Sequence, residues 1–441
     1  MDVSKQASNA WRVTIILFLI NLFNFVDRSI PAVLAEPIRH EWGLTDTELG
    51  IVVSAFTVVY ALAGIPLGRL ADKYPRKYII GGSLLLWSVL TGVTGIAWNF
   101  ASFLVFRVLV GIGESACAPS STSLISDLFP ASKRSRATGL FMLGLPVGLI
   151  FVFFSTGAIA EFFGTWRAPF FIAAIPGIIL ATCMFFIKEP VRGAAETIQV
   201  TEQKIEHPFR RIASIPTIWY LGFAFVAGNL ASYGTNSFIV PLIMRYFELP
   251  LQTAGVATGI IVGLSGLIGL TLGGVIADKL HKWNERARLI YGAANMFGAA
   301  VLTYIALSMD VSEFTAFVVL FTVGWLLQYN FYICCYPAIQ DVVEPRLRAT
   351  AMAITFTISY VLGGSAGPII IGALSDNAAN AAMLASGATE MTDHFKGIGL
   401  RQAMTWLIPS SLALSGIAFM LATRTFIKDV KKMNKRMGMH S

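Results

Sequence analysis

Four charged side chains stand within apolar stretches in the first half of the chain, namely Asp27, Arg28, Arg107 and Glu114. A charge at the centre of a bilayer costs about 2.5–3.5 kcal/mol on insertion scales, so four unpaired charges would cost about 10 kcal/mol or more. We therefore expect them to face a polar interior and to satisfy one another. A carboxyl group can load and release a proton as its surroundings change, whereas an arginine stays charged. The chemistry that this set predicts is proton exchange beside fixed cations.

The spacing of these residues predicts how they are arranged. Arg107 and Glu114 are two helical turns apart and so lie on one face. Asp27 and Arg28 are adjacent and point about 100° apart, so one can face a cavity while the other contacts a neighbouring helix. In one interpretation, Asp27 and Glu114 carry protons while Arg28 and Arg107 exchange partners or bind an anionic headgroup. In the other, the four form a static buried network that fixes the register of the helices.

The second half of the chain carries no comparable charge and offers uncharged polar groups instead. We expect contacts with a small molecule from a set on two predicted helices, spaced three to four residues apart on one face: Asn229, Tyr233, Asn236, Tyr329, Asn330 and Tyr332. Hydrogen bonding between helices is the alternative role for each of them. The contrast between the halves suggests that protons and an anionic headgroup use the first half, and less polar parts of the ligand the second.

Composition indicates which solvent surrounds the elements that carry these residues. The 441 residues are 55% hydrophobic and only 13% charged, with a mean hydropathy of +0.68, whereas a soluble protein carries about 25% charged residues. Runs such as Val13–Val26, Ile79–Ala97 and Phe170–Ile187 are long enough, or nearly so with their flanks, to cross a bilayer as helices. The chain is therefore expected to be an integral membrane protein. Asn21, Asn24 and the charges after them interrupt the first apolar run, so we interpret it as an uncleaved helix and not as a signal peptide.

The distribution of charge predicts topology. Most of the 33 Lys and Arg residues lie in alternate connections or at the two ends of the chain, which is the positive-inside pattern. It places both termini in the cytoplasm and makes the number of helices even. The same distribution explains the net charge of +8 without a nucleic-acid partner. Short loops and the lack of a targeting extension suggest a bacterial inner membrane.

We predict an all-α membrane protein with twelve transmembrane helices in two six-helix halves. The predicted spans are 12–35, 49–71, 77–97, 100–128, 137–160, 167–187, 217–243, 251–277, 287–308, 313–342, 349–374 and 401–424. The first half covers residues 1–190, a cytoplasmic linker covers 191–216, and the second half with a basic cytoplasmic tail covers 217–441. A capping box of Thr45 and Glu48 is expected to start the second helix, and a long outer connection is expected at 376–400.

The halves repeat each other. The pattern Gly-x3-Asp-Lys after the second helix (68–73) recurs after the eighth (274–279), and the segment 127–138 after the fourth helix recurs at 341–350. Such parallel repeats are typical of carriers that work by alternating access. We expect a latch that forms in one state and breaks in the other, built from Gly68, Asp72, Lys73, Arg76, Asp127, Arg134, Asp278 and Arg346.

The connection 68–77 resembles the loop motif of the major facilitator superfamily, although Pro75 replaces its second glycine. The stretches 164–170 (Gly-Thr-Trp-Arg-x2-Phe) and 107–114 (Arg-x3-Gly-x-Gly-Glu) are similar to further marks of that superfamily. The resemblance implies that Gly68 permits close approach of helices and that Asp72 accepts hydrogen bonds from a helix N-terminus. The alternative is a positive-inside loop with an ordinary cap.

A narrower resemblance rests on three fragments in order: 24–28 (Asn-Phe-Val-Asp-Arg), 107–115 and 126–137. Together they resemble the Spinster branch, whose members are similar to lysophospholipid and sphingosine-1-phosphate exporters. The resemblance implies proton-coupled transport of an amphiphilic lysolipid, with Asp27 and Glu114 as proton carriers and Arg28 and Arg107 as their cationic partners.

Two other functions stay open at this point. One is a proton-coupled symporter of small organic anions such as sugar acids, and the other is a membrane sensor that keeps the fold without transport. We find no nucleotide loop, metal-ligand spacing or nucleophile–base pair, so neither an enzyme nor a cofactor is expected. The expected partners are a lysolipid or other amphiphile, protons and membrane lipids, with the chain as a monomer.

Overall fold

The computed structural model describes residues 3–190 and 207–437, apart from the side chains of residues 3–8, 72, 131, 132, 135, 346 and 349. Within these ranges the chain is helical and contains no strand. It divides into two compact units. Unit 1 comprises Met1–Gly43, Ala55–Glu202 and Leu251–Gly259, and unit 2 comprises Leu44–Ser54, Gln203–Pro250 and Ile260–Ser441. Helix α3 therefore begins in unit 2 and continues in unit 1.

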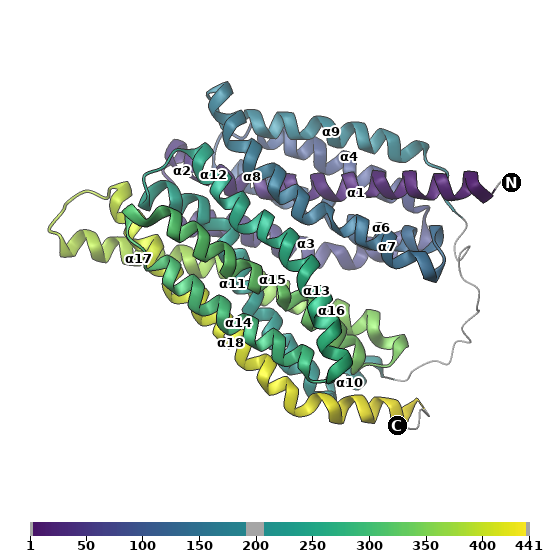
Figure 1. Ribbon diagram of the computed structural model, residues 1–441. Helices are drawn as coiled ribbons and strands as arrows, with labels where there is room; N and C mark the ends of the chain where they lie inside the picture. Colours follow the sequence, from purple (N-terminus) through teal and green to yellow (C-terminus); the bar gives the residue numbers. More distant parts are fainter. Residues whose placement is uncertain (1–2, 191–206, 438–441) are drawn as a thin grey trace. The chain divides into compact units, whose positions relative to one another are not determined.

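Unit 1 is built around helices of the first half of the chain (Figure 1). The elements in order are α1 (Val3–Val33), α2 (Ala35–Trp42), α3 (Asp46–Lys73), α4 (Arg76–Thr94), α5 (Phe100–Glu114), α6 (Cys117–Leu128), α7 (Ala131–Met142), α8 (Gly144–Phe163), α9 (Ala168–Phe186) and α12 (Leu251–Thr258). Helix α4 packs on α5 and α9, and α1 packs on α8. Their apolar core includes Leu17, Leu84 and Trp87, each fully buried.

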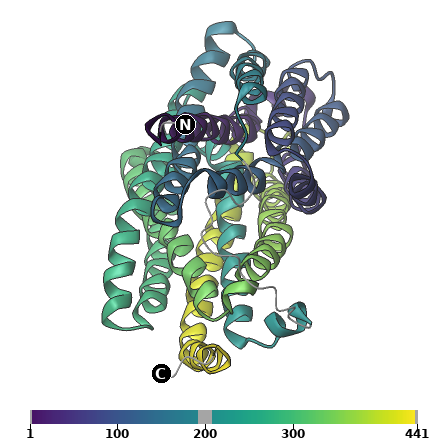
Figure 2. The same ribbon diagram turned by 90° about the vertical axis from the view of Figure 1, so that its right-hand side faces the viewer.

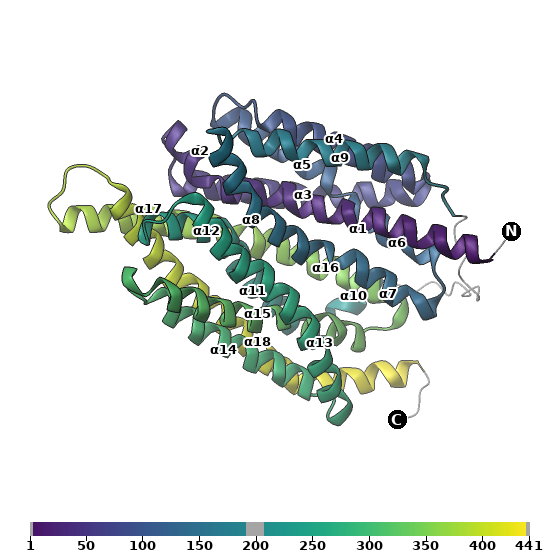
Figure 3. The same cartoon turned by 45° about the horizontal axis from the view of Figure 1, so that its top comes forward.

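Unit 2 contains most of the second half, as Figures 2 and 3 show from two further sides. The elements are α10 (Pro208–Ala213), α11 (Pro216–Tyr246), η1 (Gly259–Leu264), α13 (Ser265–Trp283), α14 (Ala287–Leu307), η2 (Val311–Glu313), α15 (Phe314–Asp341), η3 (Pro345–Leu347), α16 (Arg348–Ser359), η4 (Tyr360–Gly364), α17 (Ala366–Ala385) and α18 (Asp393–Arg436). Helix α18 packs along α11, α14 and α17.

The described residues include eleven segments that are long and apolar enough to cross a membrane. Helix α11 is not among them, although its 31 residues are ample for a span. Its hydropathy is lowered by polar residues such as Asn229, Ser232 and Asn236. Because it is also a long, largely buried helix, we count α11 as the twelfth span. The predicted all-α membrane architecture is confirmed.

Two predicted spans are confirmed, and each contains a short break. The span expected at 100–128 is found as Phe100–Leu128, with an interruption between Glu114 and Cys117. The span expected at 137–160 is found as Arg136–Phe163, divided by Leu143 into α7 and α8. The predicted outer connection 376–400 shrinks to residues 386–392, because α17 continues to Ala385 and α18 begins at Asp393. The basic tail is likewise part of helix α18. A hydropathy pattern stops at the first charges, but a helix continues through them where water or lipid headgroups solvate the charge.

The predicted start of α3 is confirmed in detail. The backbone N–H of Thr45 donates to Glu48 Oε2 at 2.8 Å, and the backbone N–H of Glu48 donates to Thr45 Oγ1 at 3.2 Å. This is the reciprocal pairing of a capping box, which satisfies donors that a helix start leaves open. The start of α3 is thereby determined by the four residues from Thr45 to Glu48.

Two segments of the long helices in unit 2 are π-helical, namely η1 and η4. Helix α11 passes very close to η4 and α17. A Cβ at Gly363 would lie 2.2 Å from the carbonyl oxygen of Val226, and one at Gly367 would lie 2.4 Å from that of Leu230. Only glycine fits at these two positions. The backbone of α11, which carries Asn229 and Asn236, therefore lies directly against the backbone of η4 and α17.

Candidate functional site

The predicted charged residues of the first half lie on two helices of unit 1, Asp27 and Arg28 on α1 and Arg107 and Glu114 on α5. Arg28 donates to Glu114 Oε2 from both Nε, at 3.2 Å, and Nη2, at 3.1 Å. Its Nη2 also reaches Asn24 Oδ1 one turn earlier on α1, at 3.4 Å. Glu114 is fully buried, and the side chain of Arg28 is 14% exposed. One arginine–carboxylate pair thus joins α1 to α5.

Asp27 is buried in a different way. It is completely inaccessible to solvent, and among the described residues neither of its oxygens accepts a hydrogen bond of good geometry. Trp87 and Thr91 of α4 lie beside it, and within the described ranges Trp87 Nε1 and Thr91 Oγ1 form no hydrogen bond of good geometry. A buried ionised carboxylate without a well-placed donor costs several kcal/mol, whereas a neutral carboxyl group costs far less. Asp27 therefore differs from Glu114, which has an arginine partner.

Arg107 completes the cluster. It is 2% exposed, and its Nη1 has no hydrogen-bond partner in the described part of the chain. It interacts electrostatically with both Glu114 and Asp27, and its guanidinium lies 5.3 Å from the ring centre of Phe56 on α3. The four predicted charges therefore share one buried region of unit 1, and Arg107 interacts with both carboxyl groups.

Small residues and aromatic rings position this cluster. A Cβ at Gly111 would lie 3.1 Å from the carbonyl oxygen of Phe56, and one at Gly113 would lie 2.9 Å from Cβ of Trp87. These glycines allow α5 to approach α3 on one side and α4 on the other. Tyr60, one turn after Phe56, has its ring centre 4.3 Å from the guanidinium of Arg28. Within a low-dielectric interior, such cation–π contacts supplement the single ion pair.

The uncharged polar residues of unit 2 form a second cluster. Asn229 on α11 donates from Nδ2 to Ser359 Oγ at 3.1 Å and accepts at Oδ1 from the hydroxyl of Tyr332 at 3.2 Å. Gln328 Nε2 donates to Ser232 Oγ at 2.7 Å. Helices α11, α15 and α16 are thus connected through side chains.

Aromatic rings adjoin these polar groups. Phe225 stacks on Tyr336 with ring centres 5.3 Å apart, Tyr336 meets Phe356 edge-on at 5.0 Å, and Tyr233 meets Tyr360 edge-on at 5.8 Å. We call Phe225, Asn229, Tyr233, Tyr332, Tyr336, Phe356, Ser359 and Tyr360 the aromatic–amide cluster. Five of its rings, those of Tyr233, Tyr332, Tyr336, Phe356 and Tyr360, are only partly buried, so they are available to a bound molecule.

Three predicted residues lie apart from this cluster's hydrogen bonds. Tyr329 donates its hydroxyl to the carbonyl oxygen of Val262 in η1 at 3.0 Å. Asn330 donates to Asn295 Oδ1 on α14 at 3.2 Å. Asn236, four residues after Ser232 on α11, is partly buried, and its Oδ1 has no partner in the described ranges. The contacts of Tyr329 and Asn330 match the alternative role of bonding between helices.

The predicted latch residues form one ion-pair network in each unit. In unit 1 the nearly buried Arg76, at the start of α4, pairs with Asp127 at the end of α6 and with Glu189 at 3.1 Å. In unit 2 Arg288, at the start of α14, pairs with Asp341 at the end of α15 at 3.1 Å. The two pairs occupy equivalent places in the repeat. The repeated sequence pattern contains Asp127 and Asp341. It did not indicate Arg288, the partner of Asp341, or the additional carboxylate Glu189.

The other latch candidates have more varied surroundings. Arg134 donates to the carbonyl oxygen of Ser126 at 3.0 Å, whereas Lys73 is exposed. Asp278 is 74% exposed and lies 3.7 Å from Arg288. A Cβ added at Gly68 would meet nothing within 4 Å, so the expected close approach of helices there is wrong for this conformation. The side chains of Asp72 and Arg346 lie outside the described part of the chain.

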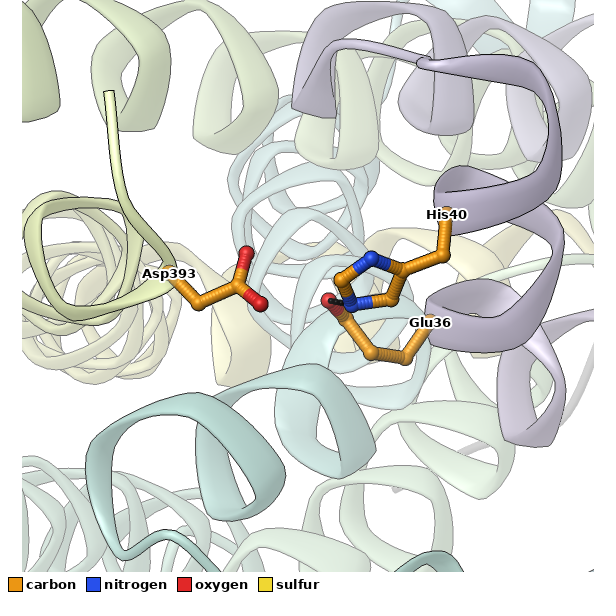
Figure 4. Close-up of side chains that lie close together, drawn as sticks. All are labelled: Glu36, His40 and Asp393. Atoms are coloured by element: carbon orange, nitrogen blue, oxygen red, sulfur yellow. Dashed lines mark ion pairs between the residues drawn. The ribbon is translucent and has the colours of Figure 1, made fainter. Parts of the chain in front are cut away.

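The short helix α2 carries a local charge cluster that the sequence did not single out. Glu36 accepts a hydrogen bond from Arg39 Nε at 2.8 Å and lies 3.3 Å from His40 Nε2 one turn later. Figure 4 shows the Glu36 and His40 side chains converging from successive turns. Since Glu36 is 3% exposed and Arg39 is 4% exposed, this pairing compensates a buried carboxylate locally.

Comparisons with known proteins agree with this architecture. The family model of the Major Facilitator Superfamily matches residues 17–368. An MFS-type efflux pump of Mycolicibacterium smegmatis is 26% identical over 96% of this chain and 94% of its own length. Protein spinster homolog 1 of Bos taurus is 30% identical over 82% of this chain and 72% of its own length.

Solved structures give the same result. The crystal structure of a bacterial homolog to the human lysosomal transporter Spinster, in an inward-facing and unoccupied conformation, has a TM-score of 0.86 and 26% identity, and the match covers 96% of this chain and 98% of that chain. The nucleoside transporter NupG has a TM-score of 0.70 at 13% identity and shares the fold alone. The chain is therefore an integral membrane protein of the major facilitator superfamily, a secondary transporter of small molecules that resembles the Spinster branch.

Proposed function

We propose that this protein couples protons to the movement of an amphiphilic, lysolipid-type substrate by alternating access. The observation that carries the proposal is the contrast between the two carboxyl groups of unit 1. Asp27 is fully buried and accepts no hydrogen bond of good geometry from the described residues, while Glu114 is fully buried and paired with Arg28 at 3.1 Å. The surroundings of Asp27 suit a carboxyl group that holds a proton, and those of Glu114 suit one that holds a charge. Proton exchange requires two such different environments.

Proton coupling follows from how these groups share arginines. A proton on Asp27 leaves Arg107 to interact with Glu114, because Arg107 faces both carboxyl groups electrostatically. Loss of that proton creates a second buried anion, which needs Arg107 as its counter-ion. Protonation of Glu114 would in turn release Arg28. Each protonation state thus favours a different pairing, and a transporter converts such differences into a preference for one conformation.

The substrate class rests on the chemistry of the two clusters. Arg28 and Arg107 provide cations for an anionic headgroup, and Arg28 also presents a guanidinium stacked on Tyr60 at 4.3 Å. The aromatic–amide cluster offers rings and a few hydrogen-bonding groups, which suit an amphiphile better than a sugar. The resemblance to Spinster proteins supports the same class, and the mycobacterial efflux relative favours export.

The Arg76 and Arg288 networks would serve as cytoplasmic latches in the transport cycle. Each joins the first turn of one helix to the last turn of another within its unit, and each includes a carboxylate of the repeated motif. We place both termini in the cytoplasm of a bacterial inner membrane, with the protein acting as a monomer. The two predicted halves, 1–190 and 217–441 around the linker 191–216, are the proposed moving parts.

The decisive experiment measures lysolipid flux and intravesicular pH in proteoliposomes. Asp27→Asn removes the exchangeable proton with almost no change in size, so we expect flux to lose its dependence on an imposed pH gradient while the protein stays folded. Glu285→Gln, at an exposed residue of the connection between α13 and α14, is the matched control and should behave as wild type. Unchanged pH dependence in Asp27→Asn removes Asp27 as the proton carrier.

A small organic anion is the second candidate substrate, because Arg28 and Arg107 could hold a carboxylate as well as a phosphate. Competition separates the two: excess lysophospholipid should block uptake of labelled lysolipid, and excess sugar acid should not. The reverse result would assign the protein to organic anions. Absence of flux for either substrate, with ligand-induced stabilisation retained, would instead favour a membrane sensor.

A further inference from the structure

A cavity of about 340 Å³ opens on unit 2, and none of its lining residues belongs to the two clusters described above. Its walls come from the end of α14 and from the second to fourth turns of α18, and they include Tyr304, Ser308, Arg401, Gln402 and Trp406. Both helices are membrane-spanning candidates. The cavity lies at the helix ends nearest the 386–392 connection, in the first part of α18.

Arg401 is the only charged residue that lines this cavity in the described part of the chain. Its Nε donates to the carbonyl oxygen of Leu307 at 2.7 Å, and its Nη1 donates to the hydroxyl of Tyr246 at 2.5 Å. The guanidinium also lies 4.5 Å from the ring centre of Tyr246. These contacts anchor the guanidinium to the protein through Nε and Nη1. Since a guanidinium has five N–H donors, three are left for a further acceptor.

No carboxylate in the described ranges neutralises this arginine by an ion pair. The acidic residues of the adjoining connection, Asp310 and Glu313, pair with each other's backbone groups as the capping box of η2. At the end of a membrane span, the charge of an arginine without an acidic partner is compensated by water or by a lipid headgroup. A phosphate would compensate it, because two of its oxygens can accept parallel hydrogen bonds from one guanidinium.

The rest of the cavity indicates where that anion comes from. Trp406 is 71% exposed and Tyr304 is 55% exposed, which is the placement of Trp and Tyr at the level of lipid headgroups. Gln402, one residue after the arginine, is exposed and adds an amide for polar headgroup atoms. Basic pockets between membrane helices are known sites for headgroups of phospholipids. A cavity with one fixed cation, a neutral amide and flanking rings fits a single headgroup.

We propose that this cavity binds the phosphate group of a membrane phospholipid, with Arg401 as its principal ligand and Trp406 and Tyr304 against the glycerol region. The bound lipid would connect α14 to α18 and stabilise unit 2. The site is separate from the transport residues, so the proposal does not depend on the proposed substrate.

The test uses the purified full-length protein in detergent, with lipid binding followed by native mass spectrometry. The probe is phosphatidylglycerol, and diacylglycerol with the same acyl chains is the control that lacks phosphate. We expect wild type to retain one phosphatidylglycerol and no diacylglycerol. Arg401→Gln should weaken retention by roughly ten-fold, the loss expected for a charge-assisted contact to phosphate. Arg424→Gln, at an exposed arginine of the same helix, should retain the lipid as wild type does.

Because Arg401 also contacts Leu307 and Tyr246, a second variant leaves those contacts intact. Gln402→Trp fills the cavity from its exposed wall and should abolish retention without unfolding the protein. Equal retention in wild type and Gln402→Trp, or equal loss in Arg401→Gln and Arg424→Gln, overturns the proposal. Thermal stabilisation by inorganic phosphate equal to that by phosphatidylglycerol would also overturn it, because the site would then bind a free anion.

Discussion

Arg28 donates two hydrogen bonds to one oxygen of Glu114, while the other oxygen of that carboxylate accepts none within the described part of unit 1. The side edge of the guanidinium, formed by Nε and Nη2, therefore binds a single oxygen, in an interior where the carboxylate is fully buried. An arrangement of this kind is less satisfied than a two-oxygen fork, in which parallel bonds hold both partners. It is held well enough to join α1 to α5, yet it leaves an acceptor open for a proton or a second cation.

Glu114→Gln should therefore be destabilising as well as inactivating. Removing one member of a buried pair leaves the other charge uncompensated, at a cost of about 3–5 kcal/mol. We expect a lower unfolding temperature and loss of pH-driven flux. The double variant Arg28→Gln/Glu114→Gln removes both charges and should recover stability but not flux. Wild-type stability and flux in Glu114→Gln would show that the pair is dispensable.

The latch residues should differ in importance according to their burial. Arg76 is nearly buried and serves two carboxylates, so Arg76→Ala should reduce the initial transport rate at least about ten-fold, with Arg76→Lys intermediate. Asp278 is 74% exposed and 3.7 Å from its arginine, and such surface pairs contribute about 0–1 kcal/mol. Asp278→Asn should therefore transport nearly as wild type. Comparable losses in both variants would indicate that burial does not set the strength of these contacts.

A second buried pair holds the start of α3 in unit 2. Arg245 on α11 donates to Asp46 Oδ2 at 2.9 Å, and both side chains are at most 2% exposed. Ser375 on α17 donates to the same oxygen at 2.6 Å. We expect Arg245→Leu to lower the free energy of unfolding by about 3–5 kcal/mol. In a double-mutant cycle with Asp46→Asn, the two effects should be strongly non-additive. Simple addition would contradict a direct interaction.

The pair Glu41–Arg167 predicts a pH dependence of stability. Hydrogen bonding from Arg167 Nη2, at 2.6 Å, lowers the pKa of Glu41 below its ordinary value. A lowered folded-state pKa stabilises the fold above the unfolded pKa, near 4.3, and this contribution is lost as the pH falls through the folded pKa. Because Glu41 is 39% exposed, the effect should be about 1 kcal/mol or less.

Thermal unfolding of wild type and Arg167→Gln between pH 7 and about pH 3 checks this linkage. The variant should start less stable at neutral pH and lose less stability on acidification. Glu41→Gln should show the same flattening, because it removes the titrating group itself. Parallel pH profiles for wild type and both variants would mean that other carboxyl groups govern the acid response.

The fold was predictable because local sequence patterns determine it. Apolar runs, alternating basic loops and a repeated loop motif define the helices and their pairing into two similar sets. The break between Glu114 and Cys117 was not predictable, since the residues there are small and apolar enough for a continuous helix. It depends on how α5 and α6 pack in unit 1. The part of α18 before Arg401, which runs through Lys396, was missed for the opposite reason, because hydropathy treats interfacial charges as helix ends.

The candidate site was predictable only where charge marks it. The insertion cost identifies Asp27 and Glu114, and helical spacing relates Arg107 to Glu114. Nothing in the sequence distinguishes Trp87 and Thr91 from other residues of an apolar helix, yet they line the surroundings of Asp27. In unit 2 the residues are neutral, so spacing alone could not separate Tyr332, which bonds to Asn229, from Tyr329, which bonds to Val262. Those choices depend on tertiary packing of neighbouring helices.

The π-helical segment η4 lies between two parts of one long helix that face different neighbours. Before it, Phe356 and Ser359 belong to the aromatic–amide cluster. After it, Asp376 accepts hydrogen bonds from the backbone N–H groups of Asp46 and Thr47 at 3.0 and 2.9 Å. A π segment accommodates about one residue more than an α-helix of the same number of turns, and one residue corresponds to a rotation of about 100°. The insertion therefore acts as an angular offset: without it, the register that places Phe356 and Ser359 would turn Asp376 away from the start of α3.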